Sequence, residues 1–371
     1  MRLRHALADS VGSPGWHDAL RNVSRELFIG DAVYRTDAVR GDLWVPVRRA
    51  EVGEDDWLAL VYADETWVTQ VDGVLAGEAR EAVTGDPSSS STFPGLVVRM
   101  LEAAGIGEGD RVLEIGTGTG YSTALMCHRL GQEAVTSIEY DRQVAFRAAK
   151  AITEAGYAPA LVVGDGLLGH EDNAPYDRLI ATCSVRTIPV TWTEQVRVGG
   201  TITAPMRGWM GGVASAHLTV DEDGTASGRF LKDDLYFMTA RPHLPPSRPS
   251  VVSGLGEARA SRIDPGVFDE DTAVWVAQLA VPHAQLSWGE DRTFLVDVGT
   301  GAQADIGPSP DGGWTVRQHG PVRLWDAVEE AVLLWQDAGS PHQSAFGLTV
   351  AKDRQYVWLG EPDGPSWDLP T

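Results

Sequence analysis

Val112-Leu113-Glu114-Ile115-Gly116-Thr117-Gly118-Thr119-Gly120-Tyr121 is the stretch that decides the fold of this chain. A short apolar run ends in three glycines at alternate positions, and residues 122–130 follow with helical spacing. Glycines permit a tight turn in which the backbone approaches a ligand closely, and the start of a helix supplies N–H groups without intrahelical partners. The stretch therefore predicts a strand, a ligand-binding turn and a helix.

The pattern around this turn predicts a parallel sheet. From residue 110 to about residue 205, short apolar runs alternate with helical segments, which is typical of βαβ units. Such a sheet binds ligands at the carboxyl ends of its strands, where the strand order reverses. We expect strands at residues 111–115, 134–139, 160–163, 176–182 and 200–205, and helices at residues 122–130, 142–155 and 192–196.

The glycine turn alone does not identify the ligand, because dinucleotide-binding enzymes use a similar one. The dinucleotide fingerprint requires a glycine three residues after Gly118, and that position is Tyr121. Glu114, two residues before Gly116, instead suits the cationic amino-acid end of S-adenosylmethionine.

Two further acids follow the next two strands. Glu139 comes 19 residues after Gly120, where a carboxylate can accept both hydroxyls of a ribose, and Asp165 is placed to accept an adenine amino group. Each acid taken singly is more often a solvated loop residue or a helix cap. Acids at three successive strand ends favour the cofactor.

These motifs, in this order, resemble those of the protein-L-isoaspartate methyltransferase family. The resemblance covers roughly residues 85–210, with a fainter echo at Tyr62 and Asp64, and rests on Glu114 through Tyr121, Gly164-Asp165-Gly166, Ala174-Pro175-Tyr176-Asp177-Arg178, Gly199-Gly200 and Ala204-Pro205. It implies an α/β, class I (Rossmann-like) S-adenosylmethionine-dependent methyltransferase fold. The cofactor residues implied are Glu114, Gly116, Thr117, Gly118, Gly120, Glu139, Tyr140, Asp165 and Gly166.

The resemblance also implies a catalytic hydroxyl in a loop before Pro94. Alignment on that proline puts the hydroxyl at Thr92, with Ser90 and Ser91 just before it. Consecutive serines and prolines favour local side-chain bonds, so we expect residues 84–94 to form a loop, and taken alone this tract would indicate a flexible linker.

Two segments depart from the family pattern, residues 88–92 and residues 182–189. With the C-terminal residues, they resemble the homologues found with ribosomal peptide maturation systems. Those homologues methylate an aspartate carboxylate in a precursor peptide, and the ester closes to an aspartimide. General repair of isoaspartyl residues is the alternative. A non-enzymatic scaffold is a third interpretation, which the intact glycine turn and acids disfavour.

Three parts are expected: an N-terminal lobe (residues 1–84), the methyltransferase domain (85–240) and an α+β substrate-recognition module (250–371). In the lobe, residues 58–62 are strand-like, and the Pro-rich residues 241–249 indicate a linker. The module has strand-like runs at residues 293–298, 314–316 and 355–359, a helix at 322–337, and five tryptophans that are core fillers or peptide contacts: Trp314, Trp325, Trp335, Trp358 and Trp367.

Composition limits the partners. The formal charge of −22, from 30 Lys+Arg and 52 Asp+Glu, would repel a phosphate backbone, so nucleic acid is excluded as a substrate. The acidity indicates either simple solubility, which we favour, or attraction of a basic peptide segment. No apolar run reaches the roughly 20 residues of a membrane span. Two cysteines without metal-ligand spacing suit a reducing cytoplasm, and no metal is expected.

Overall fold

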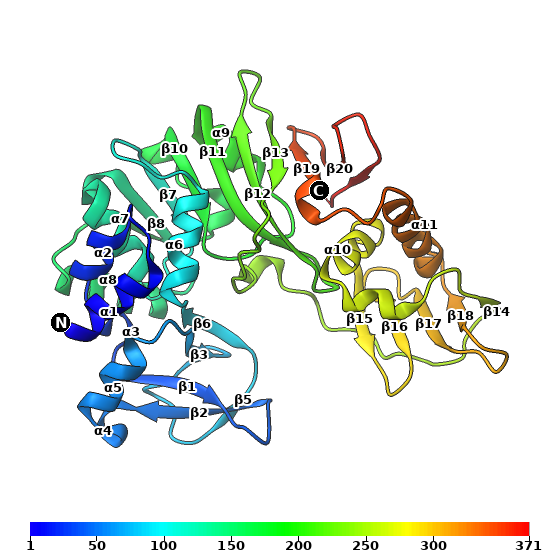
Figure 1. Cartoon of the computed structure of the whole chain (residues 1–371), viewed down its shortest axis with the longest axis horizontal. Helices are drawn as coiled ribbons and strands as arrows, with labels where there is room; N and C mark the ends of the chain where they lie inside the picture. Colours follow the sequence, from blue (N-terminus) through cyan, green and yellow to red (C-terminus); the bar gives the residue numbers. More distant parts are fainter. Residues whose placement is uncertain (371) are drawn as a thin grey trace. The chain divides into compact units, whose positions relative to one another are not determined.

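The structure, a computed structural model, describes residues 1–370 and contains two compact units (Figure 1). The first unit consists of residues 1–183 and 191–203, and the second of residues 184–190 and those from 204 onward. The division falls within β11 (Val196–Arg207), not near residue 245 as the Pro-rich segment predicts. The physical reason is strand pairing, because β13 (Ala226–Phe230) pairs with β19 (Phe346–Val350) from the C-terminal part of the chain.

The N-terminal part of the first unit is built on a six-stranded sheet. Its order is β4-β3-β1-β2-β5, and β6 pairs with β3. The strands are β1 (Ala32–Thr36), β2 (Leu43–Arg48), β3 (Trp67–Val71), β4 (Val74–Leu75), β5 (Val83–Thr84) and β6 (Pro87–Ser91). The helices are α1 (Arg2–Val11), α2 (His17–Asn22), α3 (Glu26–Ile29), α4 (Arg49–Val52) and α5 (Glu54–Val61).

The strand-like interpretation of residues 58–62 is wrong, because α5 includes most of them. Trp57 and Val61 of this helix are fully buried in a core that also contains Trp67 of β3. The apolar run is continuous because the last turns of this short helix are enclosed. Periodicity alone cannot distinguish such a short buried helix from a strand.

The expected loop over residues 84–94 is also wrong in part. Residues 87–91 form β6, an irregular antiparallel partner of β3. Ser88 donates to the side-chain oxygen of Gln70, and the Thr69 hydroxyl donates to Ser89. The serine hydroxyls thus bond to side chains of the neighbouring strand, and the main chain remains available for pairing.

The parallel sheet of the first unit matches the expected strands to within a few residues. Its order is β11-β10-β7-β8-β9, and neighbouring strands in this order pair in parallel. The strands are β7 (Val112–Ile115), β8 (Val135–Glu139), β9 (Ala160–Val163), β10 (Tyr176–Ala181) and β11. The connecting helices are α7 (Tyr121–Leu130), α8 (Arg142–Glu154) and α9 (Val190–Gln195), and α6 (Pro94–Ala103) precedes β7 (Figure 1). The class I methyltransferase arrangement of strands and helices is therefore present.

The second unit is mixed α and β, as the sequence predicts. One set of antiparallel strands has the order β21-β20-β19-β13-β12, and a five-stranded sheet has the order β14-β18-β17-β16-β15. Helices α10 (Asp271–Ala280) and α11 (Leu324–Asp337) belong to this unit. The remaining strands are β12 (Val213–Val220), β14 (Ala258–Ala260), β15 (Ala284–Trp288), β16 (Thr293–Asp297), β17 (Gln303–Pro308), β18 (Trp314–His319), β20 (Gln355–Leu359) and β21 (Ser366–Asp368).

The C-terminal tryptophans separate by burial. Trp325, Trp335 and Trp358 are buried, so these three fill the core. Trp314 and Trp367 are partly exposed. Among the described residues of this unit, Trp288 is the most exposed tryptophan, with an exposed fraction of 59%. No helix among residues 1–370 combines the length and the apolar character needed to cross a bilayer.

Candidate functional site

Three acids meet at the carboxyl ends of neighbouring parallel strands. Glu114 lies in β7, Glu139 ends β8 and Asp165 follows β9. All three act electrostatically on the thiol of Cys183, just beyond β10: enclosure raises the pKa of this thiol to about 12, and the carboxylates of Glu139, Asp165 and Glu114 add to the rise. The structure therefore gathers the predicted acids at one edge of the sheet, where negative charge suits a cationic ligand.

The glycine turn begins where the sequence predicts. Gly116 has a φ of 100°, and a Cβ there would lie 2.9 Å from the Thr182 hydroxyl, so only glycine fits. The N–H groups of Gly116 and Thr117 donate to the Ile138 carbonyl, and that of Gly118 donates to Glu139. The expectation of free N–H donors is thus not met at these three positions, because the turn is fastened to the end of β8.

Glu114 is buried beneath the turn. Its exposed fraction is 0%, and its carboxylate accepts hydrogen bonds from the hydroxyls of Ser122, Thr123 (2.5 Å) and Ser137 (2.7 Å). Burial raises the pKa of Glu114 to about 6, against the lowering effect of these hydroxyls. Thr117 joins the same network, because its hydroxyl lies 2.6 Å from that of Ser137. Contact of Glu114 with a ligand ammonium stays a prediction.

Glu139 is half-buried and fixes the turn from the next strand. One carboxylate oxygen accepts the N–H of Gly118 at 2.8 Å, and the other accepts the N–H of Asp141 at 2.9 Å. Each carboxylate oxygen has a second acceptor site. Glu139 therefore holds the turn in place, and its contact with a ligand ribose stays a prediction.

The other predicted cofactor residues lie beside these acids. Asp165 caps a short 3-10 turn by accepting the N–H of Leu167 at 3.0 Å, so the alternative role as a cap is observed. Gly166 is buried against Ile115, whose side chain would lie 2.4 Å from an added Cβ. Tyr140 is half exposed. Their contact with a cofactor stays a prediction.

Two hollows border the turn. The larger, of about 530 Å³, is within the range of small-molecule pockets. Thr117 and Glu139 line it, with the remaining wall supplied by Arg142, Ala145, Phe146, Ala149, Leu161, Val162 and Val163. Tyr140, Asp165 and Gly166 are not part of this wall, so the hollow includes only part of the predicted cofactor site.

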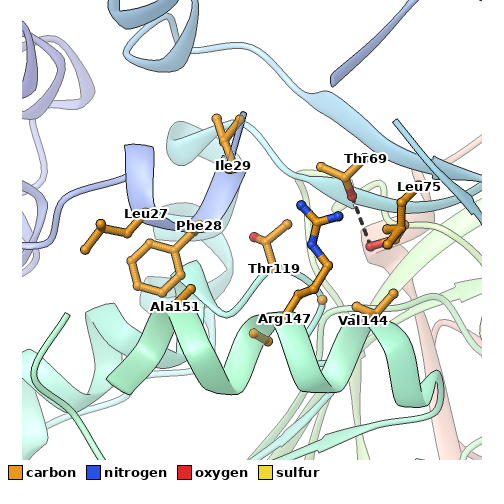
Figure 2. A pocket seen from close by; sticks show the side chains of 13 residues that line it. Leu27, Phe28, Ile29, Thr69, Leu75, Thr119, Val144, Arg147 and Ala151 are labelled. Atoms are coloured by element: carbon orange, nitrogen blue, oxygen red, sulfur yellow. Dashed lines mark hydrogen bonds between the residues drawn. The ribbon is translucent and has the colours of Figure 1, made fainter. Parts of the chain in front are cut away.

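The smaller hollow, about 50 Å³, lies between α3, the glycine turn and α8 (Figure 2). Figure 2 shows the Arg147 guanidinium near Thr119 and Thr69. Its volume is far below the range of small-molecule pockets, so it cannot hold a nucleoside.

The three predicted hydroxyls do not face the same way. Successive side chains of a strand point to opposite faces, and Ser91 is 2% exposed whereas Ser90 is partly exposed. The main-chain oxygen of Ser90 would lie 3.8 Å from a Cβ on Gly118, so the end of β6 passes next to the glycine turn. The buried Ser91 hydroxyl has no hydrogen-bond partner among the described residues, and Thr92 follows directly after the strand.

Sequence reasoning missed two residues here. Cys183 lies where the acids converge, and only its place after the fourth strand pointed to it. Arg25 contacts the main chain at Ser91 and Thr92. A single arginine before a short helix carries no signal of burial, so the sequence offers no means of finding it.

Comparison with known proteins identifies the region that carries these features. Residues 77–228 match a sequence model of the family described as protein-L-isoaspartate(D-aspartate) O-methyltransferase. A protein-L-isoaspartate O-methyltransferase of Thermotoga maritima is 33% identical over 162 residues, which are 43% of this chain and 51% of the relative. One from Ignicoccus hospitalis is 40% identical over 115 residues, 30% of this chain and 54% of that protein. The chain thus spans about half the length of the curated relatives it matches.

A solved structure titled protein-L-isoaspartate O-methyltransferase resembles a larger part of the chain. The likeness covers 97% of this chain and 99% of that one, with a TM-score of 0.54 and 20% identity. At this identity the likeness shows the fold, and it includes most of the residues beyond the segment that matches the family model.

Proposed function

We propose that this chain, whose residues 77–228 match the protein-L-isoaspartate(D-aspartate) O-methyltransferase family model, is an S-adenosylmethionine-dependent carboxyl O-methyltransferase acting on peptides or proteins. The observation that carries the proposal is the set of three acids at neighbouring strand ends beside the glycine turn: Glu114 bonded beneath the turn, Glu139 bonded to Gly118, and Asp165 directly after β9. S-adenosylmethionine carries a sulfonium and an ammonium, and three carboxylates provide the potential that such a cation requires.

The chain's residues fit this cofactor. Glu139 would accept the ribose hydroxyls, and Asp165 would accept the adenine amino group through the oxygen not used in its cap. When bound, the cofactor supplies a sulfonium methyl group that a carboxylate oxygen takes as the carbon–sulfur bond breaks and its electron pair stays on sulfur.

The acceptor needs little chemical activation. A carboxylate is ionised near pH 7 and needs no general base, so the protein's contribution is to place it in line with the methyl group. In this proposal the Thr92 hydroxyl is the principal contact of the carboxylate and the partly exposed Ser90 hydroxyl a second one, whereas Ser91, whose hydroxyl is buried, only supports the end of β6. The end of β6 passes next to Gly118, which brings the acceptor side next to the cofactor side.

Within this activity we propose an aspartate of a ribosomally made precursor peptide as the acceptor. After methylation, the backbone nitrogen of the following residue attacks the ester carbonyl, loses its proton and expels methanol, which leaves an aspartimide. The departures from the family pattern at residues 88–92 and 182–189 support this acceptor. The C-terminal residues do not discriminate, because a structure titled protein-L-isoaspartate O-methyltransferase matches 97% of this chain.

Repair of isoaspartyl residues in proteins generally is the second candidate. The names of the matched relatives favour it. The two candidates differ in acceptor and in product, since repair requires an isoaspartyl linkage and the maturation reaction begins from ordinary aspartate.

A matched set of peptides separates them. The full chain is incubated with S-adenosylmethionine and one peptide sequence carrying aspartate, isoaspartate or asparagine at one position, and with any peptide encoded next to the gene. Mass spectrometry then follows the addition of a methyl group and the later loss of methanol. Methylation of aspartate followed by loss of methanol supports the maturation reaction, and use of isoaspartate alone supports repair. Equal signals from the asparagine control would exclude carboxyl methylation.

A further inference from the structure

Arg25 is an arginine buried inside the first unit, immediately before α3. Its side chain is inaccessible to solvent, with an exposed fraction of 0%. The four N–H groups on its two Nη atoms reach five main-chain carbonyl oxygens, one of these N–H groups being shared between two acceptors, and its Nε–H has no partner among the described residues. Burial lowers the pKa of Arg25 to about 10, so the group remains a cation near neutral pH.

The five carbonyls belong to two segments that are distant in sequence. Nη1 donates to Val61 and Ala63, both at 2.8 Å, and Nη2 donates to Glu65 at 2.8 Å. Nη2 also reaches Thr92 at 3.2 Å and Ser91 at 3.4 Å. One side chain therefore joins the end of α5 to the end of β6, where the proposed acceptor hydroxyls lie.

Two further contacts join the same segments from the other side. The Thr66 hydroxyl accepts the N–H of Phe93 at 3.1 Å, and the Asp64 carboxylate accepts the N–H of Gly95 at 2.7 Å. The approach is close, because a Cβ on Gly95 would lie 2.6 Å from the Asp64 carboxylate. Residues 91–95 are thus held at both ends by residues 61–66.

Arg25 also approaches the cofactor side. Its guanidinium carbon lies 6.0 Å from the centre of the Tyr121 ring, within the range of a cation–π contact. Tyr121 is 3% exposed and is the first residue of α7, directly after Gly120 of the glycine turn. The same guanidinium therefore contacts the acceptor loop and the residue that ends the cofactor turn.

We propose that Arg25 is a positioning residue for methyl transfer, which sets the place of Thr92 relative to the glycine turn through the main chain of residues 91 and 92. This inference rests on the proposed function of the site. Arginine suits the task because its planar, forked donors can address carbonyls on two sides at once, whereas a lysine ammonium is a compact point charge.

The test compares Arg25→Lys and Arg25→Met with the unaltered chain, using the full protein and the acceptor peptide that it methylates. We expect kcat to fall by about 100-fold, since misplacement by about 1 Å can cost that much. Affinity for S-adenosylhomocysteine should change by less than about twofold, because the lost hydrogen bonds all go to residues 61–65 and 91–92, while the Tyr121 ring is 3% exposed and also packs against Phe28. Measurements are made well below the unfolding temperature and per folded molecule, so that loss of stability does not imitate loss of turnover.

Arg178→Lys is the matched control. Arg178 is a partly buried arginine that bonds to Asp110 and Thr201 and not to residues 91–95, and we expect its replacement to lower the unfolding temperature without changing kcat. Thr66→Val removes the hydroxyl that accepts the N–H of Phe93 and so releases the acceptor loop independently of Arg25. It should lower kcat, and the effects of Thr66→Val and Arg25→Lys should not add, because both variants release the same loop.

Hydrogen exchange of the main chain gives a readout that does not depend on activity. Arg25→Lys should speed exchange across residues 87–96 and leave residues 122–130 of α7 as they were. Normal kcat per folded molecule in both Arg25 variants, or uniform acceleration of exchange throughout the first unit, would overturn the positioning role. If the unaltered chain methylates no carboxyl group, the proposed function fails, and the exchange experiment still decides whether Arg25 fixes the loop.

Discussion

Single residues at the site combine structural and binding tasks, and Glu114 shows the structural one most clearly. Its carboxylate lies under the glycine turn and accepts three hydroxyl hydrogen bonds, without a cation as partner in that network. Hydroxyls compensate only part of the cost of burying a charge, so the pKa of Glu114 rises to about 6. The residue that begins the sequence motif is thus held in place by the protein's own interior.

The raised pKa predicts a specific dependence of stability on pH. The folded pKa, about 6, lies above the reference value of 4.5, so the folded state binds the proton more tightly, and stability falls as pH rises from 4.5 through about 6. This term is about 2 kcal/mol. Glu114→Gln should lack this pH-dependent term. The free energy of unfolding, measured with urea, should therefore fall less for the variant than for the unaltered chain as pH rises from 4.5 to about 7. Parallel pH curves for the two proteins would contradict the assignment.

Glu139 supports the second prediction at this scale. Glu139→Ala removes a carboxylate that accepts the Gly118 N–H and would accept the ribose hydroxyls. Affinity for S-adenosylmethionine, measured by calorimetry, should fall by about 1.5–3 kcal/mol, the range for hydrogen bonds to charged groups. Glu133→Ala, at an exposed position of the preceding turn, serves as the control. Equal affinity in both variants would mean that Glu139 does not contact the cofactor.

Among the elements, β6 contributes most to the acceptor side and was the hardest to predict. Its pairing with β3 fixes which serines face the interior, because side chains alternate along the strand. Ser89 and Ser91 are buried, whereas Ser90 is partly exposed and Thr92 follows the strand end. The four hydroxyls are therefore not equivalent, although the sequence presents them as one tract.

This difference predicts opposite outcomes for two substitutions. Thr92→Val should lower kcat while affinity for S-adenosylmethionine stays nearly unchanged, because the hydroxyl contacts the acceptor. Ser91→Ala should raise the free energy of unfolding by about 1 kcal/mol, because it removes a buried hydroxyl without a hydrogen-bond partner, and should leave kcat unchanged. Normal turnover in Thr92→Val together with loss of turnover in Ser91→Ala would move the acceptor contact one residue earlier.

The sequence predicts the central strands of the parallel sheet well because both faces of these strands are buried. Strands β7, β8 and β10 have short apolar runs and polar boundaries, because helices cover a parallel sheet on both sides, and the sequence predicts their ends to within one residue. β6 has no apolar residue, so neither alternation nor propensity marks it. Its strand character comes from pairing with β3 and from hydroxyl bonds to Gln70 and Thr69, which are distant in sequence.

The same reasoning applies to the site. The acids at the strand ends could be predicted because the topology of a parallel sheet brings those ends together. Arg25 could not, since its role depends on the folding of residues 61–66 and 91–95 around one guanidinium. Local pattern identifies residues that bind at strand ends, and it misses residues that join segments from different parts of the chain.

For the whole molecule, charge is the property that bears on the choice of substrate. The chain carries 30 basic and 52 acidic residues, a formal charge of −22. Exposed charges of one sign raise the local concentration of oppositely charged ligands over about one Debye length, roughly 10 Å at 0.1 M salt. A peptide with basic residues beside its acceptor should therefore bind more readily than one with acidic residues, whichever acceptor the chain uses.

The last prediction compares two peptides with the same acceptor and lysines or glutamates on both sides of it. At low salt the KM of the lysine peptide should be lower by on the order of tenfold, and the difference should shrink as salt is raised to about 0.5 M, because screening weakens exposed charges while leaving the contacts at the acceptor unchanged. The kcat values should remain similar, since the flanking charges act on encounter and not on the placement of the carboxylate. Equal KM values at low salt would show that the acidity serves solubility and does not select the substrate. A difference that persists at high salt would instead point to specific contacts with the flanking residues, and the partly exposed Trp314 and Trp367 and the exposed Trp288 are then the first positions to replace.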